Sequence, residues 1–164
     1  MATILVIDDS ASVLALTADF LRTAGHTVLT TSSGRRAFAI LDEQPVDLVL
    51  TDIYMPEPDG LEILTKARDN QLCVPFVAMS SQLGDTNFFK LAKALGAVTT
   101  LQKPFTAPQL NTVVDLVLRK RKAGANGTDH PAAPRPSKSV GRSIVLAPVN
   151  GRHGDSDDKD FARY

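Results

Sequence analysis

The chain has 164 residues, of which 43% are hydrophobic and 22% charged, as expected for one globular domain with a core of useful size. Its 18 basic and 18 acidic residues balance to zero, so the total charge gives no indication of a nucleic-acid or membrane partner. The single cysteine, Cys73, excludes an internal disulfide, and we expect it to be a small buried hydrophobic residue.

The neutral total conceals two parts of different charge. Residues 1–119 carry nine Lys or Arg and thirteen Asp or Glu, whereas residues 120–164 carry nine and five. At the amino terminus, the apolar run Ile4–Ile7 is too short for a signal peptide or a membrane span. We therefore expect a cytoplasmic protein without a membrane partner.

Short β-branched or aliphatic runs alternate with helix-period stretches over the first 120 residues. The expected strands are Thr3–Ile7, Thr27–Thr30, Val46–Leu50, Phe76–Met79 and Val98–Leu101. The apolar stripes of the expected helices fall within Val13–Leu21, Ala37–Leu41, Leu61–Leu64, Phe88–Leu95 and Leu110–Val117. This alternation predicts an α/β fold, in which a five-stranded parallel sheet is covered on both faces by five helices.

Several residues mark where the helices should begin and end. Ser10 and Thr106 are suitable amino-terminal caps, because their hydroxyl oxygens can accept from free backbone N–H groups. Gly25 and Gly96 lie where two helices should end, since glycine accepts the left-handed conformation found there. Pro108 falls in a first helical turn, where its missing N–H does no harm.

The helical periodicity stops after Lys122. Residues 123–142 are rich in Ala, Gly, Pro and Ser, which indicates a flexible linker, and an apolar patch follows at residues 144–149. We therefore predict a domain at residues 2–122 and a flexible, disordered tail at residues 123–164. The patch is either a chance apolar cluster or a segment that docks on the domain or on a partner. The basic run at residues 119–122 is interpreted as the solvated end of the last helix rather than as a nucleic-acid contact.

Three carboxylates are expected to converge at one edge of the sheet. Asp8 and Asp9 follow the first strand, and Asp52 follows the third. Taken alone, Asp8 and Asp52 would be interpreted as turn residues. However, parallel strands have their carboxyl ends at the same edge, which is where such sheets bind ligands. Crowded carboxylates repel each other, and a hard divalent cation such as Mg²⁺ offsets that cost.

Further polar residues are expected at the same edge. Lys103 follows the fifth strand, where its ammonium could pair with Asp52, and Pro104 restricts its backbone to an extended conformation. The Lys103–Pro104 bond is open to either isomer. Ser80 and Ser81 end the fourth strand; we expect the Ser80 hydroxyl at the site and Ser81 in a local cap or turn.

Together these motifs resemble the receiver domain of bacterial two-component response regulators. The resemblance covers residues 2–121 and rests on five motifs in order, namely Asp8-Asp9-Ser10, Asp52, Met55-Pro56-Glu57-Pro58-Asp59-Gly60, Ser80 and Lys103-Pro104-Phe105. It implies a flavodoxin-like (βα)5 fold. It also implies that the chain is a phosphorylation-dependent signalling module, which catalyses its own phosphotransfer and dephosphorylation and is not a turnover enzyme.

The resemblance implies a role for each matching residue. Asp52 would be the phosphoacceptor and a ligand of Mg²⁺. Asp9 would bind Mg²⁺ directly, Asp8 partly through water, and Tyr54 through its backbone carbonyl. Ser80 would be the switch hydroxyl, and Lys103 would contact the phosphoryl oxygens. The phosphodonor would be a histidine kinase or a histidine phosphotransfer protein, and the output would pass to a downstream protein that the sequence does not identify.

One departure from the family pattern leaves an alternative open. Thr100 occupies the position where receivers usually carry an aromatic residue that turns inward on activation. The alternative is a degenerate receiver, which would bind a partner without phosphorylation. An aspartate-nucleophile phosphatase is disfavoured, because such enzymes resemble one another in a second Asp two residues after the nucleophile, where this chain has Tyr54.

Overall fold

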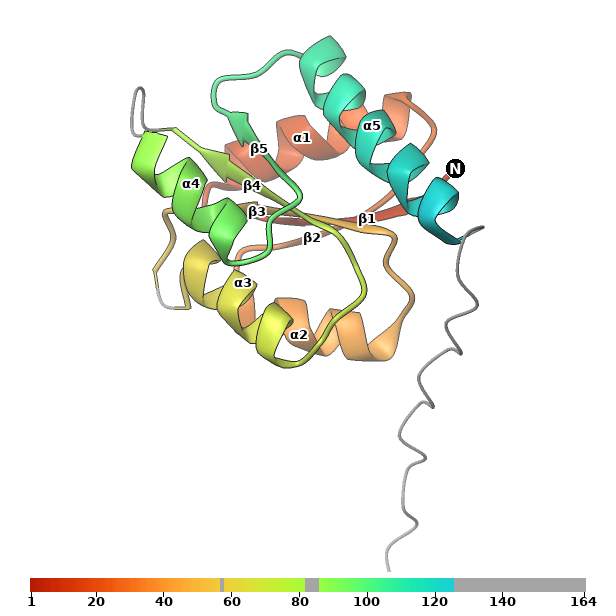
Figure 1. The fold of residues 1–164 in the computed structure, drawn as a ribbon. Helices are drawn as coiled ribbons and strands as arrows, with labels where there is room; N and C mark the ends of the chain where they lie inside the picture. Colours follow the sequence, from red (N-terminus) through yellow and green to blue (C-terminus); the bar gives the residue numbers. More distant parts are fainter. Residues whose placement is uncertain (57, 82–85, 126–164) are drawn as a thin grey trace, which may run out of the picture. The chain divides into compact units, whose positions relative to one another are not determined.

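The computed structural model describes residues 1–56, 58–81 and 86–125 (Figure 1). Strands and helices alternate along this part of the chain. The strands are β1 (Thr3–Ile7), β2 (Thr27–Thr31), β3 (Leu48–Asp52), β4 (Phe76–Ser80) and β5 (Thr99–Gln102). The helices are α1 (Ala11–Thr23), α2 (Gly34–Glu43), α3 (Gly60–Asp69), α4 (Thr86–Ala94) and α5 (Ala107–Ala125). The predicted boundary at Lys122 is wrong by three residues, because residues 123–125 belong to α5. From position 126 onward the predicted tail, with its apolar patch at residues 144–149, lies outside the described residues.

The strands form one parallel sheet in the order β2-β1-β3-β4-β5, which confirms the predicted fold class. Two strands are displaced along the sequence from their expected positions. β3 begins at Leu48 instead of Val46. Asp47, just before it, still contacts β1, because its side chain accepts from the backbone N–H of Thr3 at 2.9 Å and its own N–H donates to the Thr3 carbonyl at 2.8 Å. β5 begins one residue after Val98, which is 54% exposed.

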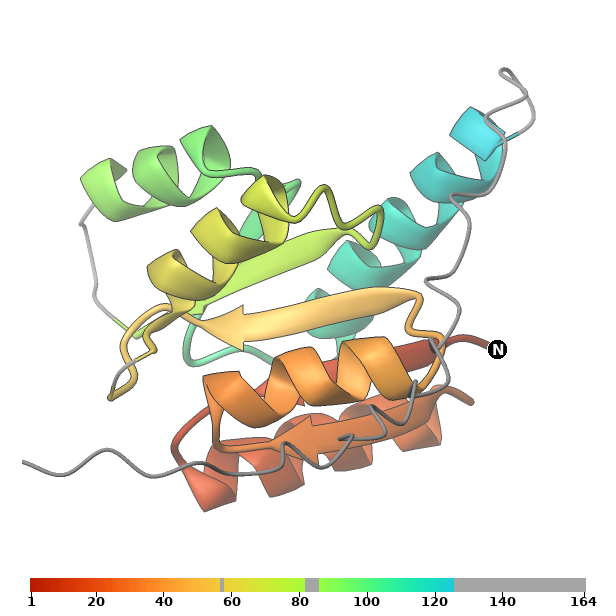
Figure 2. The same ribbon diagram turned by 90° about the horizontal axis from the view of Figure 1, so that it is seen from below.

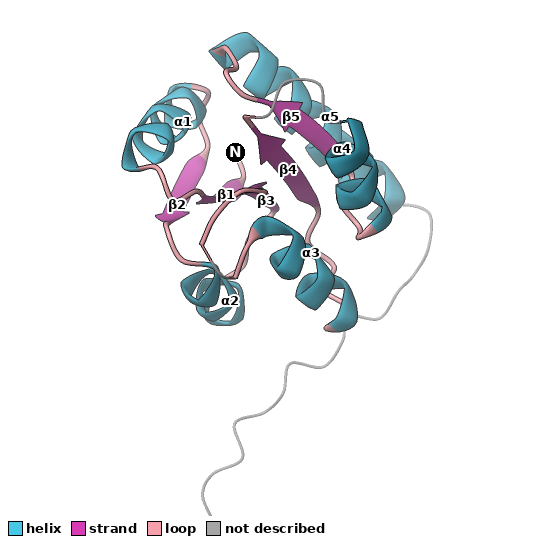
Figure 3. Ribbon diagram, turned by 90° about the vertical axis from the view of Figure 1, so that its left-hand side faces the viewer, coloured by secondary structure: helices cyan, strands magenta, loops and turns pink. Residues whose placement is uncertain are grey.

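Helices lie on both faces of the sheet (Figures 1 and 2), and an apolar layer holds them on each face. On one face, Leu21 of α1 and Leu110, Val114 and Val117 of α5 pack with the strand residues that point toward them. On the other face lie α2, α3 and α4, whose Ala37, Ile40, Ile63, Leu64 and Ala92 belong to a second cluster. Figure 3 shows α1 and α2 on either side of β2, and α4 beside β5.

The predicted helix boundaries are confirmed at the marked residues. The Ser10 hydroxyl accepts from the backbone N–H of Val13 at 3.4 Å, and the Thr106 hydroxyl accepts from that of Gln109 at 3.5 Å. Gly25 and Gly96 have φ values of 86° and 111°, in the left-handed region that favours glycine.

Three expectations about apolar residues are wrong, and one concerns Leu91 in the apolar stripe of α4, which is 44% exposed. Cys73 is exposed, because it lies in the loop between α3 and β4, where Leu72 and Val74 on either side of it pack against the core. Leu16 belongs to the apolar stripe of α1 but is 50% exposed, since it lies away from the buried Thr17, Ala18 and Leu21. Among the described residues, no helix is long and apolar enough to cross a membrane.

Candidate functional site

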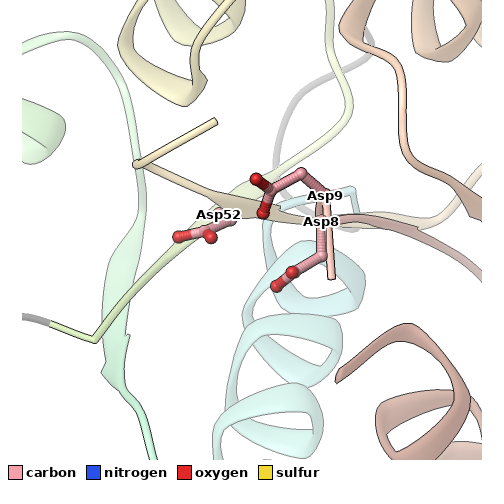
Figure 4. A group of neighbouring side chains, drawn as sticks. All are labelled: Asp8, Asp9 and Asp52. Atoms are coloured by element: carbon pink, nitrogen blue, oxygen red, sulfur yellow. The ribbon is translucent and has the colours of Figure 1, made fainter. Parts of the chain in front are cut away.

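Three carboxylates meet at the carboxyl edge of the sheet (Figure 4). Asp8 directly follows β1 and is fully buried, Asp52 is the last residue of β3 and is 4% exposed, and Asp9 is exposed. Carboxylate oxygens of all three lie within 4.8 Å of one another. The parallel register of β1 and β3 produces this convergence, because it pairs Ile7 with Thr51, the residues just before Asp8 and Asp52.

Lys103 joins this cluster from the loop after β5. Its Nζ lies 2.6 Å from Oδ2 of Asp8 and 2.9 Å from Oδ2 of Asp52, and its side chain is 11% exposed. The backbone N–H of Lys103 donates to the carbonyl of Ser80 at 2.7 Å, which fixes the loop to the end of β4. The Lys103–Pro104 peptide bond is cis. One ammonium therefore bridges two buried carboxylates, whereas the sequence suggested its pairing with Asp52 alone.

The charges in this cluster are unequally stabilised. Burial raises the pKa of Asp52 above its ordinary value of 3.8, with a contribution from the charge of Asp8, and this outweighs the hydrogen bond from Lys103. Burial alone would lower the pKa of Lys103, but its hydrogen bonds to Asp8 and Asp52 raise it above 10.5. Lys103 is therefore firmly charged at neutral pH, while ionised Asp52 remains short of compensating positive charge.

Replacing Lys103 by Gln is expected to destabilise the metal-free protein by roughly 3–5 kcal/mol at pH 7, because two buried carboxylates lose their cation. The raised pKa of Lys103 means that its contribution is fully present below pH 10.5 and is lost as the pH rises through the folded-state pKa. Urea unfolding with a chelator present measures the effect. The control is Lys66→Gln, which breaks an exposed pair with Glu62 and should cost less than about 1 kcal/mol. Equal losses of unfolding free energy in the two variants would contradict the role of Lys103 as the cation that compensates two buried carboxylates.

The remaining predicted site residues lie around Asp52. The backbone N–H of Tyr54 donates to Oδ1 of Asp52 at 3.3 Å. Ser80 is the last residue of β4 and is 2% exposed, and the exposed Ser81 follows it. Thr100 lies on β5 opposite Ala78 and is partly buried. Glu57, the third residue of the motif Met55–Gly60, lies outside the described residues.

A cavity of about 460 Å³ opens beside the carboxylates and extends the site beyond the residues expected from the sequence. Val13 and Leu16 of α1 form one part of its wall, and Pro104 and Phe105 form another. The exposed Leu16 is thus a member of the site, although its helical spacing resembled that of a core residue. The arrangement combines an acidic end, a buried cation and an apolar wall.

Comparisons with known proteins agree with this geometry. The response regulator receiver domain family matches residues 4–115. The regulatory protein PhoP of Bacillus subtilis, named for alkaline phosphatase synthesis and transcriptional regulation, is 31% identical over 127 residues, which cover 77% of this chain and 52% of that protein. The response regulator SaeR of Staphylococcus epidermidis is 32% identical over 112 residues, which cover 67% of this chain and 47% of that protein.

Solved structures show the same fold. A response regulator receiver domain protein from Clostridium thermocellum aligns with a TM-score of 0.70 and 31% identity, over 75% of this chain and 98% of that one. The match therefore involves a whole receiver domain there. By contrast, the chain spans about half the length of the curated relatives it matches.

Proposed function

Because the chain belongs to the response regulator receiver domain family, we propose that Asp52 accepts a phosphoryl group from a phosphohistidine. The donor would be a histidine kinase or a histidine phosphotransfer protein. The observation that carries the proposal is the placement of Asp52, which ends β3 with Lys103 at 2.9 Å and lines an open cavity of about 460 Å³. A buried structural ion pair would not require such access.

The proposed reaction is a phosphoryl transfer between two side chains. A carboxylate oxygen of Asp52 forms a bond to phosphorus, and the phosphorus–nitrogen bond of the donor histidine breaks. Lys103 already lies against Asp52, so its ammonium is in place to stabilise the negative charge of the transferring group. The product adds nearly two negative charges at the site, which Lys103 and the hydroxyl of Ser80 would bind.

The donor set fits Mg²⁺. Oxygens of Asp8, Asp9 and Asp52 lie within 4.8 Å of one another, and carboxylates are the ligands that a hard divalent cation prefers. The pKa of Asp52 is raised, which indicates that Lys103 alone does not compensate the acidic charge. Asp9, Asp8 and Asp52 would hold the ion with the backbone carbonyl of Tyr54. When bound, Mg²⁺ would neutralise charge on the phosphoryl group.

The apolar wall of the cavity suits a protein donor. A helix that carries phosphohistidine could place an apolar side chain against Leu16 and Phe105 while its imidazole reaches Asp52. The signal would then spread through the end of β4 and the loop after β5, which the hydrogen bond from the Lys103 N–H to the Ser80 carbonyl joins. Phosphorylation would shift these two parts together and change the affinity for a downstream protein. In this shift, Thr100 would take the place of the aromatic residue that receivers usually carry at this position.

Intact-protein mass tests the proposal. The full chain is incubated with acetyl phosphate, with Mg²⁺ or with a chelator, and samples are taken from seconds to hours. We expect the mass of one phosphoryl group to be added only when Mg²⁺ is present. An unmodified chain at every time point would refute phosphorylation by this small donor. A phosphorylated histidine phosphotransfer protein as a second donor would then decide between the proposal and the phosphorylation-independent receiver.

Replacing Asp9 by Asn is expected to weaken Mg²⁺ binding at least tenfold and to change the metal-free stability by less than about 0.5 kcal/mol, because Asp9 is exposed. Mg²⁺ that binds the folded state should raise the melting temperature of the native chain. Calorimetric melting across a Mg²⁺ titration measures both quantities. Asp19→Asn, the same change at an exposed position of α1, should respond to Mg²⁺ like the native chain. A native response in Asp9→Asn would remove Asp9 from the metal site.

A further inference from the structure

The turn between β2 and α2, at residues 31–34, lies against two other segments of the carboxyl edge. At its start, the carbonyl of Thr31 accepts from the backbone N–H of Asp8 at 3.2 Å. At its end, Gly34, the first residue of α2, packs against Pro58 in the loop between β3 and α3. We call residues 31–34 the bridging turn, because both segments that it contacts carry residues of the candidate site.

The bridging turn is held in one shape by its own hydrogen bonds. The Thr31 hydroxyl accepts from the backbone N–H of Ser33 at 3.1 Å and donates to the carbonyl of Ser33 at 3.3 Å. The Ser33 hydroxyl accepts from the backbone N–H of Arg36 at 3.4 Å and so caps the start of α2. A turn that is fixed in this way passes a displacement on to its neighbours instead of absorbing it.

The contact between Gly34 and Pro58 leaves no room for a side chain on the turn. A Cβ atom at position 34 would lie 2.7 Å from Cγ of Pro58 and 2.9 Å from the carbonyl oxygen of Pro58. It would also lie 2.9 Å from Cδ1 of Ile63, but that methyl group can rotate away. Pro58 is buried, and its ring fixes the backbone torsion φ. A larger residue at position 34 must therefore push Pro58 away from the start of α2.

A displacement of Pro58 would be passed on to Tyr54, because both lie in a loop whose ends are joined. The backbone N–H of Gly60 donates to the carbonyl of Ile53 at 3.2 Å and closes this loop. Between these ends, the N–H of Tyr54 donates to Oδ1 of Asp52 at 3.3 Å. Because the ends are held, a shift of Pro58 has to be accommodated by the backbone that includes Tyr54.

We propose that the bridging turn is a positioning element of the metal site. Through Gly34 it sets the place of the loop that carries the Tyr54 carbonyl, and through Thr31 it sets the place of Asp8. The inference rests on the proposed function, in which Asp8 and Tyr54 are ligands of Mg²⁺. This ion requires nearly ideal octahedral geometry, so a small shift of one ligand group weakens its binding. Residues 31–34 are therefore positioning residues that act through the ligands.

Gly34→Ala in the full chain tests this role. We expect this variant to bind Mg²⁺ about fivefold or more weakly than the native chain, because the loop of Tyr54 is displaced. Backbone amide NMR shifts across a Mg²⁺ titration, without any phosphodonor, give the dissociation constants. The matched control is Ile40→Val, which shortens a buried side chain of the same helix and lowers stability without contact to Pro58. Native affinity in Gly34→Ala, or equal weakening in Ile40→Val, would overturn the proposal.

A double-mutant cycle tests whether Pro58 is the group that transmits the effect. Pro58→Ala removes Cγ, the atom that the new Cβ atom would approach most closely. The Gly34→Ala/Pro58→Ala variant should therefore bind Mg²⁺ about threefold or more tightly than the product of the two single effects predicts. Single effects that simply multiply would overturn the role of this contact.

Thr31→Val supplies a second test that does not depend on the folding of Gly34→Ala. Valine keeps the shape of the side chain but removes the hydroxyl that holds Ser33, so we expect Mg²⁺ affinity to fall about twofold or more. Thr31→Ser keeps the hydroxyl and should bind like the native chain. Equal affinities of these two variants would overturn the proposal and leave the proposed function intact. A native chain that binds no Mg²⁺ would refute the proposed metal site, and this inference with it.

Discussion

Asp52→Asn is expected to reduce the Mg²⁺-dependent phosphorylation of the chain to background and, at the same time, to make the metal-free protein more stable at pH 7. An amide is not a nucleophile toward phosphorus, so the acceptor is lost. It is also neutral, so Lys103 keeps its partner Asp8 while the second buried charge disappears. Intact mass and thermal melting measure the two effects on the same sample.

The direction of the stability effect follows from the pKa of Asp52. This pKa is raised in the folded state, so ionisation of Asp52 costs folding free energy, about 1.4 kcal/mol for each unit of elevation. The cost is absent below the ordinary value of 3.8 and fully present once the pH exceeds the folded-state pKa. The stability advantage of Asp52→Asn should therefore appear as the pH rises through this window. It should be measurable as a higher Tm of the variant at pH 7.

Two outcomes would contradict the assignment of Asp52. A phosphoryl group that persists in Asp52→Asn would identify another acceptor, with Asp9 as the nearest exposed carboxylate. A variant that is less stable than the native chain at every pH would mean that the ion pair with Lys103 outweighs burial of the charge. Asp19→Asn, exposed on α1, should change neither quantity.

The sequence predicts the meeting of Asp8, Asp9 and Asp52 because that meeting depends on topology alone. Two short runs, one followed by Asp8 and Asp9 and the other by Asp52, must share one edge once the strands are parallel. The second contact of Lys103, with Asp8, depends on a particular side-chain conformation, and sequence periodicity contains no information about this.

The errors at Leu16 and Cys73 have a related cause. An apolar stripe shows which face of a helix is turned toward the sheet, but it does not show how far the neighbouring helix or loop covers the edge of that face. Leu16 lies at such an edge, beside the cavity of the candidate site. Cys73 lies in a loop, where alternate residues point outward although the composition is apolar.

Gly60→Ala is expected to destabilise the protein by about 3 kcal/mol or more, although alanine is the better helix former. Gly60 is the first residue of α3, and a Cβ atom there would lie 2.0 Å from the carbonyl oxygen of Asp52 and 2.7 Å from Cα of Ile53. Both obstructing atoms belong to the backbone at the end of β3, so no side-chain rotation relieves the overlap. Urea unfolding at pH 7 measures the loss.

The same overlap should impair phosphorylation. The chain at Asp52 must move to accommodate the new methyl group, and the carboxylate would move away from Lys103 and from Asp8. The rate of modification by acetyl phosphate should therefore fall in any Gly60→Ala protein that still folds. A Gly60→Ala variant with native stability and a native phosphorylation rate would contradict this prediction, because the end of β3 could then move without loss of either.

Gly25→Ala separates this steric effect from the general cost of replacing a glycine. Gly25 has a φ of 86°, and a Cβ atom there would meet nothing within 4 Å. The substitution should cost only about 1–2 kcal/mol, from the left-handed backbone conformation, and should leave the phosphorylation rate unchanged, because Gly25 lies between α1 and β2. A larger loss at Gly60 that is coupled to a slower reaction would tie the close approach of α3 to the position of Asp52. In that case Gly60 is required because the start of α3 lies directly against the backbone at the end of β3, which carries Asp52.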